Sequence, residues 1–211
     1  MNSASDPSIF IVDDDEDIRS SLSRALRTRG YNVRAFASAK AFLDSRAFEQ
    51  PGCLVLDFGM PEMSGLDLQR LLVNRGRAIP IIFITGHGGV PEAVQDIKNG
   101  AVDFLEKPFR QEALIKRIEA AFKLDAQMRL VDEKSRSTKE RYDKLTIRER
   151  EIAKFLVSNP SNSTSKDVAR HLGISPRTVD HHRARILEKM NIHSVAELVD
   201  LSIAANLFSE D

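Results

Sequence analysis

Polar side chains suited to metal and phosphoryl chemistry recur in the first half of the chain, each at the end of a short apolar run. They are Asp13, Asp14, Asp57, Thr85 and Lys107. Three carboxylates brought together repel one another and take up protons unless a cation lies between them. Mg²⁺ meets that need, because it takes oxygen ligands and keeps several waters. With a hydroxyl that donates a hydrogen bond and an ammonium that offsets anionic charge, this set predicts a site for phosphoryl transfer to a carboxylate.

A simpler interpretation is that each acid only caps the helix that follows it. That interpretation suits Asp15, Glu16 and Asp17, which stand where a helix is expected to begin. It also stays open for Asp14. It explains Asp57 poorly, because the residues after it read Phe-Gly-Met-Pro, a sequence that does not begin a helix.

The apolar runs that precede these side chains predict the strands that must position them. They cover residues 9–12, 33–36, 53–56, 81–84 and 102–105, with helical patterns between them. Strands this apolar are buried on both faces, so five β/α repeats predict a doubly wound α/β domain with a parallel sheet. The carboxyl ends of parallel strands lie at one edge of the sheet, which would bring the polar side chains together.

Length and composition limit the alternatives. The chain has 211 residues, with 31 Lys and Arg against 31 Asp and Glu and a single cysteine, a length that predicts two domains. Because Cys53 is the single cysteine, the chain cannot form an intrachain disulfide, which fits a reducing compartment. We expect Cys53 to be a small apolar residue of the core. No apolar run approaches the roughly 18 residues that span a bilayer, and no secretory signal is evident, so we expect a cytoplasmic protein with no membrane partner. A net charge of zero, taken alone, argues against nucleic-acid binding.

The chain is expected to divide into a first domain at 1–124, a charged linker at 125–144 that we expect to be helical, and an all-α domain at 145–211. More than half of the linker residues are Asp, Glu, Lys or Arg, which is typical of a solvated helix or of a flexible segment. Asp125 and Asp132 at candidate core positions argue against a strong coiled coil. The last domain contains four helix beginnings, marked by Thr146 with Glu149, Ser165, Ser175-Pro176 and Ser194 with Glu197.

Two of these helices, at 166–172 and 176–190, have the proportions of a helix-turn-helix. One side of the second helix is apolar, and the other carries short polar and basic groups that suit a DNA major groove. The expected DNA contacts are Lys166, Arg177, Thr178, His181, His182, Arg185 and Lys189. Between 166 and 193, six Lys or Arg stand against three Asp or Glu, so this segment has an excess of positive charge although the whole chain is neutral. A solvated charged face is the simpler alternative, and irregular spacing disfavours a histidine metal site.

The motifs FIVDDDED, LVLDFGMPEMSG, IIFITGHG and GAVDFLEKPF, in this order within residues 6–123, closely resemble the receiver domain of bacterial two-component response regulators. The resemblance implies that Asp57 accepts a phosphoryl group from a phosphohistidine of a sensor histidine kinase. The implied Mg²⁺ ligands are Asp13, Asp14, Asp57 and the backbone carbonyl of Gly59. Thr85 and Lys107 would contact the phosphoryl oxygens. Phe104 matches the switch aromatic of the family, with a plain core role as the equal alternative.

The sequences LTIREREIAKFL and SKDVARHLGISPRTVDHHRARILEKMNIHSVAEL resemble the LuxR/NarL-type output domain of FixJ-like response regulators. This resemblance implies that 176–190 is a recognition helix for double-stranded promoter DNA and that 194–206 supports dimerisation. Two features depart from the family pattern. The loop at 158–166 is longer than usual, and Asp180 places an acid on the recognition helix.

Together the two resemblances predict a phosphorylation-controlled transcription regulator rather than an enzyme. Phosphorylation of Asp57 would draw Thr85 and Phe104 inward and pair the face around 90–105 with a second copy, so that a homodimer reads two half-sites. Contact with RNA polymerase stays open. The competing functions are a phosphorylation-independent DNA-binding scaffold and an Mg²⁺-dependent phosphatase. The phosphatase is disfavoured because Gly59 stands where such an enzyme places its general acid/base.

Overall fold

The computed structural model describes residues 6–76, 79–86, 101–160 and 163–208, without the side chains of 101 and 102. The spacing of Val94 and Ile97 also predicts a helix that ends at Gly100. This helix and most of the expected pairing face around 90–105 lie outside the described residues. The chain divides into two compact units, Met1–Met128 and Arg129–Asp211, which are described in turn. None of the helices in the described part of the chain is long and apolar enough to cross a membrane.

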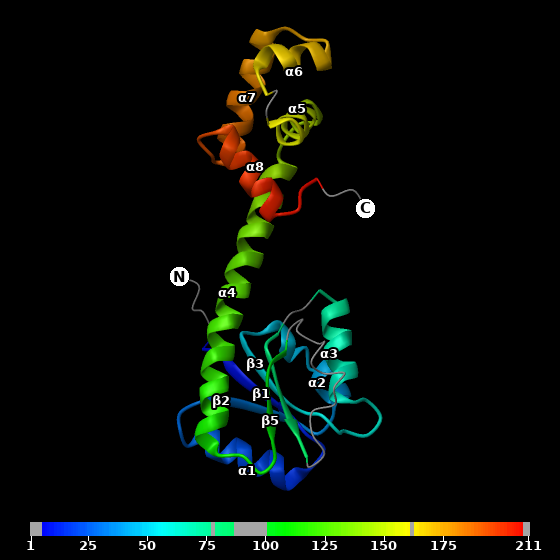
Figure 1. The fold of residues 1–211 in the computed structure, drawn as a ribbon, viewed down its shortest axis with the longest axis vertical. Helices are drawn as coiled ribbons and strands as arrows, with labels where there is room; N and C mark the ends of the chain where they lie inside the picture. The colour runs from blue at the N-terminus through cyan, green and yellow to red at the C-terminus, as the bar shows by residue number, and fades with distance from the viewer. Residues whose placement is uncertain (1–5, 77–78, 87–100, 161–162, 209–211) are drawn as a thin grey trace. The chain divides into compact units, whose positions relative to one another are not determined.

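The first unit is built on a parallel sheet in the order β2-β1-β3-β4-β5 (Figure 1). Its strands are β1 (Ser8–Val12), β2 (Asn32–Phe36), β3 (Gly52–Asp57), β4 (Ile81–Thr85) and β5 (Ala101–Glu106). All five predicted strands therefore form, each longer than its apolar run by one or two residues. The doubly wound α/β fold expected from the sequence is confirmed.

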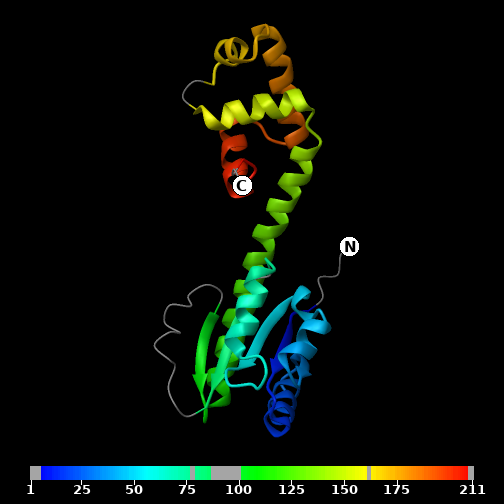
Figure 2. The same ribbon diagram turned by 90° about the vertical axis from the view of Figure 1, so that its right-hand side faces the viewer.

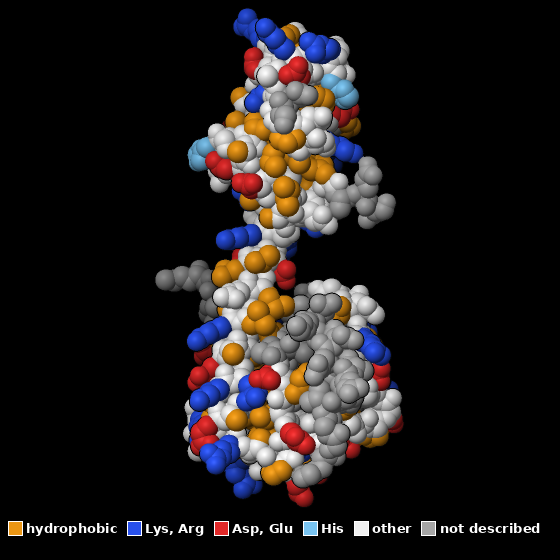
Figure 3. Space-filling model, viewed as in Figure 1, with side chains coloured by type: hydrophobic (Ala, Val, Ile, Leu, Met, Phe, Trp, Pro, Cys, Tyr) orange, Lys and Arg blue, Asp and Glu red, His pale blue; other side chains and the backbone are white. Residues whose placement is uncertain are grey.

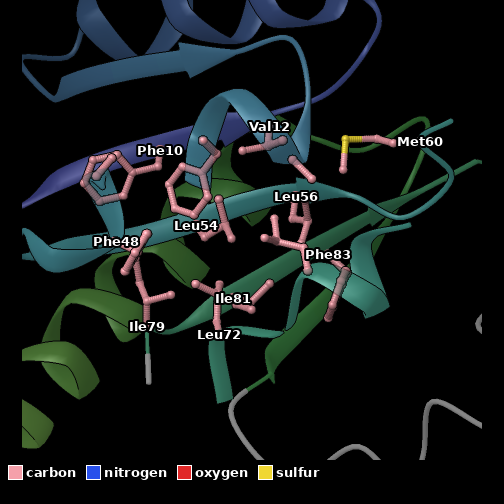
Figure 4. Packing of buried hydrophobic residues seen from close by; sticks show 14 residues of the cluster. Phe10, Val12, Phe48, Leu54, Leu56, Met60, Leu72, Ile79, Ile81 and Phe83 are labelled. Atoms are coloured by element: carbon pink, nitrogen blue, oxygen red, sulfur yellow. The ribbon is translucent and has the colours of Figure 1, made fainter. Parts of the chain in front are cut away.

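Helices cover both faces of this sheet (Figures 1 and 2). They are α1 (Glu16–Arg27), α2 (Ala39–Asp44), the short 3-10 helix η1 (Ala47–Glu49), α3 (Gly65–Asn74) and the first part of α4 (Gln111–Asp143). Alternate strand residues enter opposite cores. Phe10 and Val12 join the cluster that includes residues of α2 and α3 (Figure 4), and Ile9 and Ile11 join the cluster that includes residues of α1 and α4. Cys53 lies fully buried in the second cluster, as expected.

Helix α4 continues without a break through the segment at 125–143 that composition left undecided between helix and flexible chain. Asp125 is buried, and its carboxylate accepts a hydrogen bond of 2.9 Å from the backbone N–H of Gly52 at the beginning of β3. Asp125 therefore packs with the sheet of the first unit. It does not lie in the core of a coiled coil. The hydrogen bond to Gly52 explains why an acid stands at a position where a coiled coil would have an apolar residue.

Within its described residues, the second unit holds four more α-helices, α5 (Ile147–Ser158), α6 (Ser165–Leu172), α7 (Pro176–Met190) and α8 (Val195–Ala204). Most of the predicted caps form: Thr146 and Glu149 make a reciprocal capping box, and Ser175 caps α7 with Pro176 in its first turn. One cap was predicted one residue too late, because Thr164, not Ser165, accepts the N–H of Asp167 at the start of α6. Gly173 ends α6 in the left-handed region, at φ 66°. The all-α second domain expected from the sequence is present.

Candidate functional site

The carboxyl edge of the sheet brings three of the predicted side chains into direct contact. The Nζ of Lys107 lies 2.9 Å from Oδ1 of Asp57 and 3.2 Å from Oδ2 of Asp13. Asp57 is the last residue of β3, and Asp13 directly follows β1, the neighbouring strand in register. The parallel register thus places both acids at the same level, and the loop after β5 supplies the lysine.

The remaining oxygens of the two acids are held by backbone donors. Oδ2 of Asp57 accepts the N–H of Gly59 at 2.8 Å, and Oδ1 of Asp13 accepts the N–H of Asp15 at 2.9 Å. The side chain of Asp13 is only 3% exposed and that of Asp57 11%. Both carboxylates are therefore fixed in orientation, and the one at Asp57 keeps limited access to solvent.

The electrostatics of this cluster are unbalanced towards negative charge. Burial raises the pKa of Asp13 above its ordinary value and the nearby Asp57 adds to the rise, although the N–H of Asp15 and Lys107 oppose it. Burial alone would lower the pKa of Lys107, but its hydrogen bond to Asp57 and the charges of both acids outweigh burial and raise that pKa. Among the described residues, one ammonium thus faces two carboxylates, so a further positive charge there would be favourable.

Thr85 and Phe104 lie on the two strands beyond β3. Thr85 ends β4 and is buried, and its hydroxyl has no hydrogen-bond partner among the described residues. Most buried hydroxyls are paired, so this one is available to donate to a group bound at the sheet edge. Phe104, on β5, is half-buried and stacks on Phe83 with ring centroids 5.1 Å apart and planes 12° apart. This packing fits either of its two predicted roles.

Mg²⁺ fits this edge by donor chemistry, because two carboxylates pair there with the ammonium of Lys107 and a third acid, Asp14, follows in sequence. Asp14 is exposed, and within the described residues no three His, Cys, Asp or Glu side chains converge as a ready metal cluster. The predicted ligand set is therefore only partly assembled. At Gly59 a side chain would begin 3.7 Å from Oδ2 of Asp57. The position from which a phosphatase's general acid would act holds no side chain.

The predicted DNA surface lies on α6 and α7, and Lys and Arg side chains gather over the end of the second unit where α6 lies (Figure 3). Most of the predicted contacts are exposed: Lys166, Arg177, Thr178, His181 and Arg185, with His182 half-buried. Lys189 is different. Its Nζ lies 2.6 Å from Oε2 of the buried Glu149 on α5. We therefore exclude Lys189 from the DNA-facing set, because its charge is neutralised within the domain.

Three structural roles in this domain were missed by sequence reasoning. Asp180 accepts a hydrogen bond from the hydroxyl of Ser165, which ties α7 to α6 and accounts for an acid on the expected recognition helix. Arg183 donates to the carbonyl of Ser163 at 2.7 Å. Glu149 pairs with Lys189 as well as capping α5. Only the capping box at Glu149 left a signal in the sequence, since the other two pairs join residues at least fifteen positions apart.

Comparison with known families divides the chain in the same way as the fold. Residues 9–119 match the family described as "Response regulator receiver domain", and residues 143–202 match "Bacterial regulatory proteins, luxR family". Together these matches cover most of the chain.

Known proteins resemble the whole chain as well as its parts. The chain is 46% identical to the response regulator protein TodT of Pseudomonas putida over 90% of this chain and 83% of that protein. It is 39% identical to the transcriptional regulatory protein FixJ of Azorhizobium caulinodans over 96% of this chain and 95% of that protein. Among solved structures, the response regulator StyR matches with a TM-score of 0.75 at 41% identity, covering 93% of this chain and 98% of that one. Full-length FixJ from B. japonicum matches with a TM-score of 0.56 at 36% identity, covering 97% of this chain and 99% of that one.

Proposed function

The chain belongs to the two-component transcriptional response regulators that join a receiver domain to a LuxR-type DNA-binding domain, and from that premise we propose that Asp57 is its phosphoacceptor. The observation that carries this proposal is the setting of the Asp57 carboxylate. It is oriented by Lys107 and by the N–H of Gly59, and it lies at the same sheet edge as the hydroxyl of Thr85, which no side chain or backbone group of the described residues pairs with. A receiver of this kind takes its phosphoryl group from a sensor histidine kinase.

In the proposed reaction a carboxylate oxygen of Asp57 attacks the phosphorus of a phosphohistidine. The P–O bond forms as the P–N bond breaks, and the imidazole leaves with the electron pair. Lys107 and the hydroxyl of Thr85 are the donors that would meet the phosphoryl oxygens. The residues that would hold Mg²⁺ are Asp13, Asp14, Asp57 and the carbonyl of Gly59, and the bound ion would neutralise charge on the transferring group.

The acyl phosphate is proposed to persist as a signal. Gly59 offers no proton-transfer group beside Asp57, and such a group typically contributes about 10²–10⁴-fold to hydrolysis. The added charge, close to −2, would attract the Thr85 hydroxyl towards the phosphoryl group, and Phe104 would take up the space released. Pairing with a second copy would then bring two α7 helices onto DNA half-sites about one helical turn apart.

We propose that α7 is the recognition helix. Its contacts with the DNA would come from Arg177, Thr178, His181 and Arg185, with His182 at the edge of this surface and Lys166 contributing from α6. Their exposure supports this assignment. A phosphohistidine donor and promoter DNA are both cytoplasmic partners, which fits the expected location. Direct contact of the bound dimer with RNA polymerase is an additional proposal for the same complex.

A labelling experiment tests the proposed phosphoacceptor. The full chain is treated with a small-molecule acyl phosphate and Mg²⁺, and its intact mass is followed with time. We expect one stable phosphoryl group in the wild-type protein and none in Asp57→Asn. Asp67→Asn, an exposed acid of α3, is the matched control and should label normally. Sustained release of phosphate would instead favour the phosphatase, and absence of labelling would favour the phosphorylation-independent scaffold.

A further inference from the structure

Three arginines in the second unit each donate to the last carbonyl of a helix. Arg148 donates to Leu172 at the end of α6 (2.8 Å), Arg150 to Asp143 at the end of α4 (2.7 Å), and Arg141 to Met190 at the end of α7 (2.8 Å). The last carbonyls of a helix lack partners within it and carry the negative end of its dipole, so cations are favoured there. These guanidinium groups are thus committed within the domain.

Arg141 differs from the other two because it lies on α4, ahead of the residues that match the LuxR-type family. Its guanidinium is held in place by its own helix. The Nε donates to the carbonyl of Ser137 at 3.2 Å, and one terminal nitrogen lies 3.4 Å from the hydroxyl of Thr138. Thr138 is itself only 1% exposed. The side chain of Arg141 is therefore pre-oriented towards the end of α7.

The contact supplies a partner that α7 cannot provide for itself. The N–H of Asn191 turns back to Glu188 and Leu187, and the N–H of Ile192 goes to Leu187. The carbonyl of Met190 instead takes its hydrogen bond from Arg141, while the Met190 side chain is fully buried. The carboxyl end of α7 is thus fixed by backbone turns, by core packing and by one charged donor from α4.

We propose that Arg141 is a positioning residue for DNA reading, so that the functional DNA-binding unit begins within α4 rather than at the start of the family match. Arg141 acts through α7: by fixing the end of this helix it sets the placement of Arg177 and Arg185, which lie on the same rigid element. Contacts of this kind require placement to within about half an ångström. This inference rests on the proposed role of α7 as the recognition helix.

The test uses the full chain and a DNA duplex selected by the wild-type protein from a randomised pool. Arg141→Met keeps the aliphatic stem and removes every donor. We expect its Kd for the duplex to rise about tenfold, in line with the loss of a charged hydrogen bond. The slope of log Kd against log salt concentration should stay unchanged, because Arg141 does not contact phosphate. Arg141→Lys, which retains a charged donor, should restore most of the affinity.

Arg136→Met is the matched control, since Arg136 is an exposed arginine of the same helix that pairs only weakly with Glu140, at 3.9 Å. It should bind DNA as the wild-type protein does. Affinities are referred to the active fraction found by stoichiometric titration, so a partial loss of folded protein does not imitate weaker binding. Should Arg141→Met fail to fold, Arg141→Gln takes its place, and Arg141→Lys should still bind more tightly than it.

Two results would overturn the proposal. A salt slope reduced by about one would mean that Arg141 contacts a phosphate directly. Equal affinities for Arg141→Met and Arg136→Met would mean that the contact with Met190 serves stability alone. Arg185→Ala separates this inference from the recognition-helix assignment. If that variant binds DNA normally, the assignment of α7 fails, and the positioning proposal is withdrawn with it.

Discussion

Replacing Glu149 by glutamine should weaken the second unit through the loss of a single charge. Glu149 is buried, and its Oε2 accepts hydrogen bonds from the backbone N–H of Thr146 at 2.8 Å and from the Nζ of Lys189 at 2.6 Å. The glutamine amide can still accept the N–H of Thr146, so the helix cap survives in Glu149→Gln. What is lost is the ion pair between α5 and α7, which leaves the ammonium of Lys189 without its counter-charge.

The size of this effect follows from the exposure of the two partners. A hydrogen bond between charged groups contributes about 1.5–3 kcal/mol. Lys189 keeps 28% of its side chain exposed and can recover some hydration, so we expect the lower part of that range, about 1.5–2 kcal/mol. In a unit of this size, 1 kcal/mol shifts the melting temperature by roughly 4–8 °C. The transition of the second unit should therefore fall by roughly 10 °C.

The pH dependence of stability in the same variant checks independently that the charge of Glu149 stabilises the folded state. The pKa of Glu149 lies below its ordinary value of 4.5, because hydrogen bonds and the charge of Lys189 outweigh the opposing effect of burial. At acid pH the unfolded state then binds more protons than the folded state, so this stability is present above pH 4.5 and is lost as the pH falls through the lowered pKa. The gap between wild type and Glu149→Gln should close over that range.

Scanning calorimetry of the full chain at neutral and acid pH measures both effects. Glu151→Gln removes an exposed acid that pairs with Arg148 on the same helix and serves as the control, with an expected change near zero. Equal melting temperatures of Glu149→Gln and Glu151→Gln at neutral pH would show that the ion pair with Lys189 does not stabilise the unit. A difference in melting temperature between Glu149→Gln and wild type that is the same at every pH would equally contradict this prediction.

Three further predictions follow from other contacts. Asp125→Ala should lower the unfolding free energy of the first unit by about 2 kcal/mol in urea titrations, because a buried backbone N–H loses its acceptor; Asp132→Ala, exposed on the same helix, should not. Lys107→Met should slow labelling by an acyl phosphate about 100-fold through loss of a donor to the phosphoryl oxygens, and an unchanged labelling rate would remove lysine from the mechanism. Arg185→Ala should weaken DNA binding by about 1–3 kcal/mol and relax the base preference at the position it contacts, whereas Lys189→Met should leave the salt slope unchanged, because the Lys189 ammonium is bound to Glu149.

The sheet and the acidic edge were predictable because their signals are local. Residues 9–12 and 53–56 are uniformly apolar, and parallel pairing then obliges Asp13 and Asp57 to share an edge. Helix caps such as Thr146 and Ser175 are equally local, since the capping side chain and its N–H lie within three residues. The one shifted cap, from Ser165 to Thr164, reflects two adjacent residues with the same capping chemistry.

Long-range polar contacts could not be predicted in the same way. Asp125 was interpreted from its neighbours in sequence, but its partner Gly52 lies 73 positions away. Lys189 has the residue type of a DNA contact and became a partner of Glu149, 40 positions away. Arginines and lysines that hold a domain together do not differ in sequence from those that contact DNA. Only the arrangement of helices separates the two groups.

The central claim, that phosphorylation of Asp57 controls DNA binding, is tested most directly by one titration. Wild-type protein and Asp57→Asn are each titrated onto the selected duplex, with and without an acyl phosphate and Mg²⁺. We predict that the phosphodonor tightens binding by the wild-type protein and makes it cooperative, as expected for a dimer, and that it leaves Asp57→Asn unchanged. Equal binding by the wild-type protein in both conditions, with labelling verified by mass, would contradict the account.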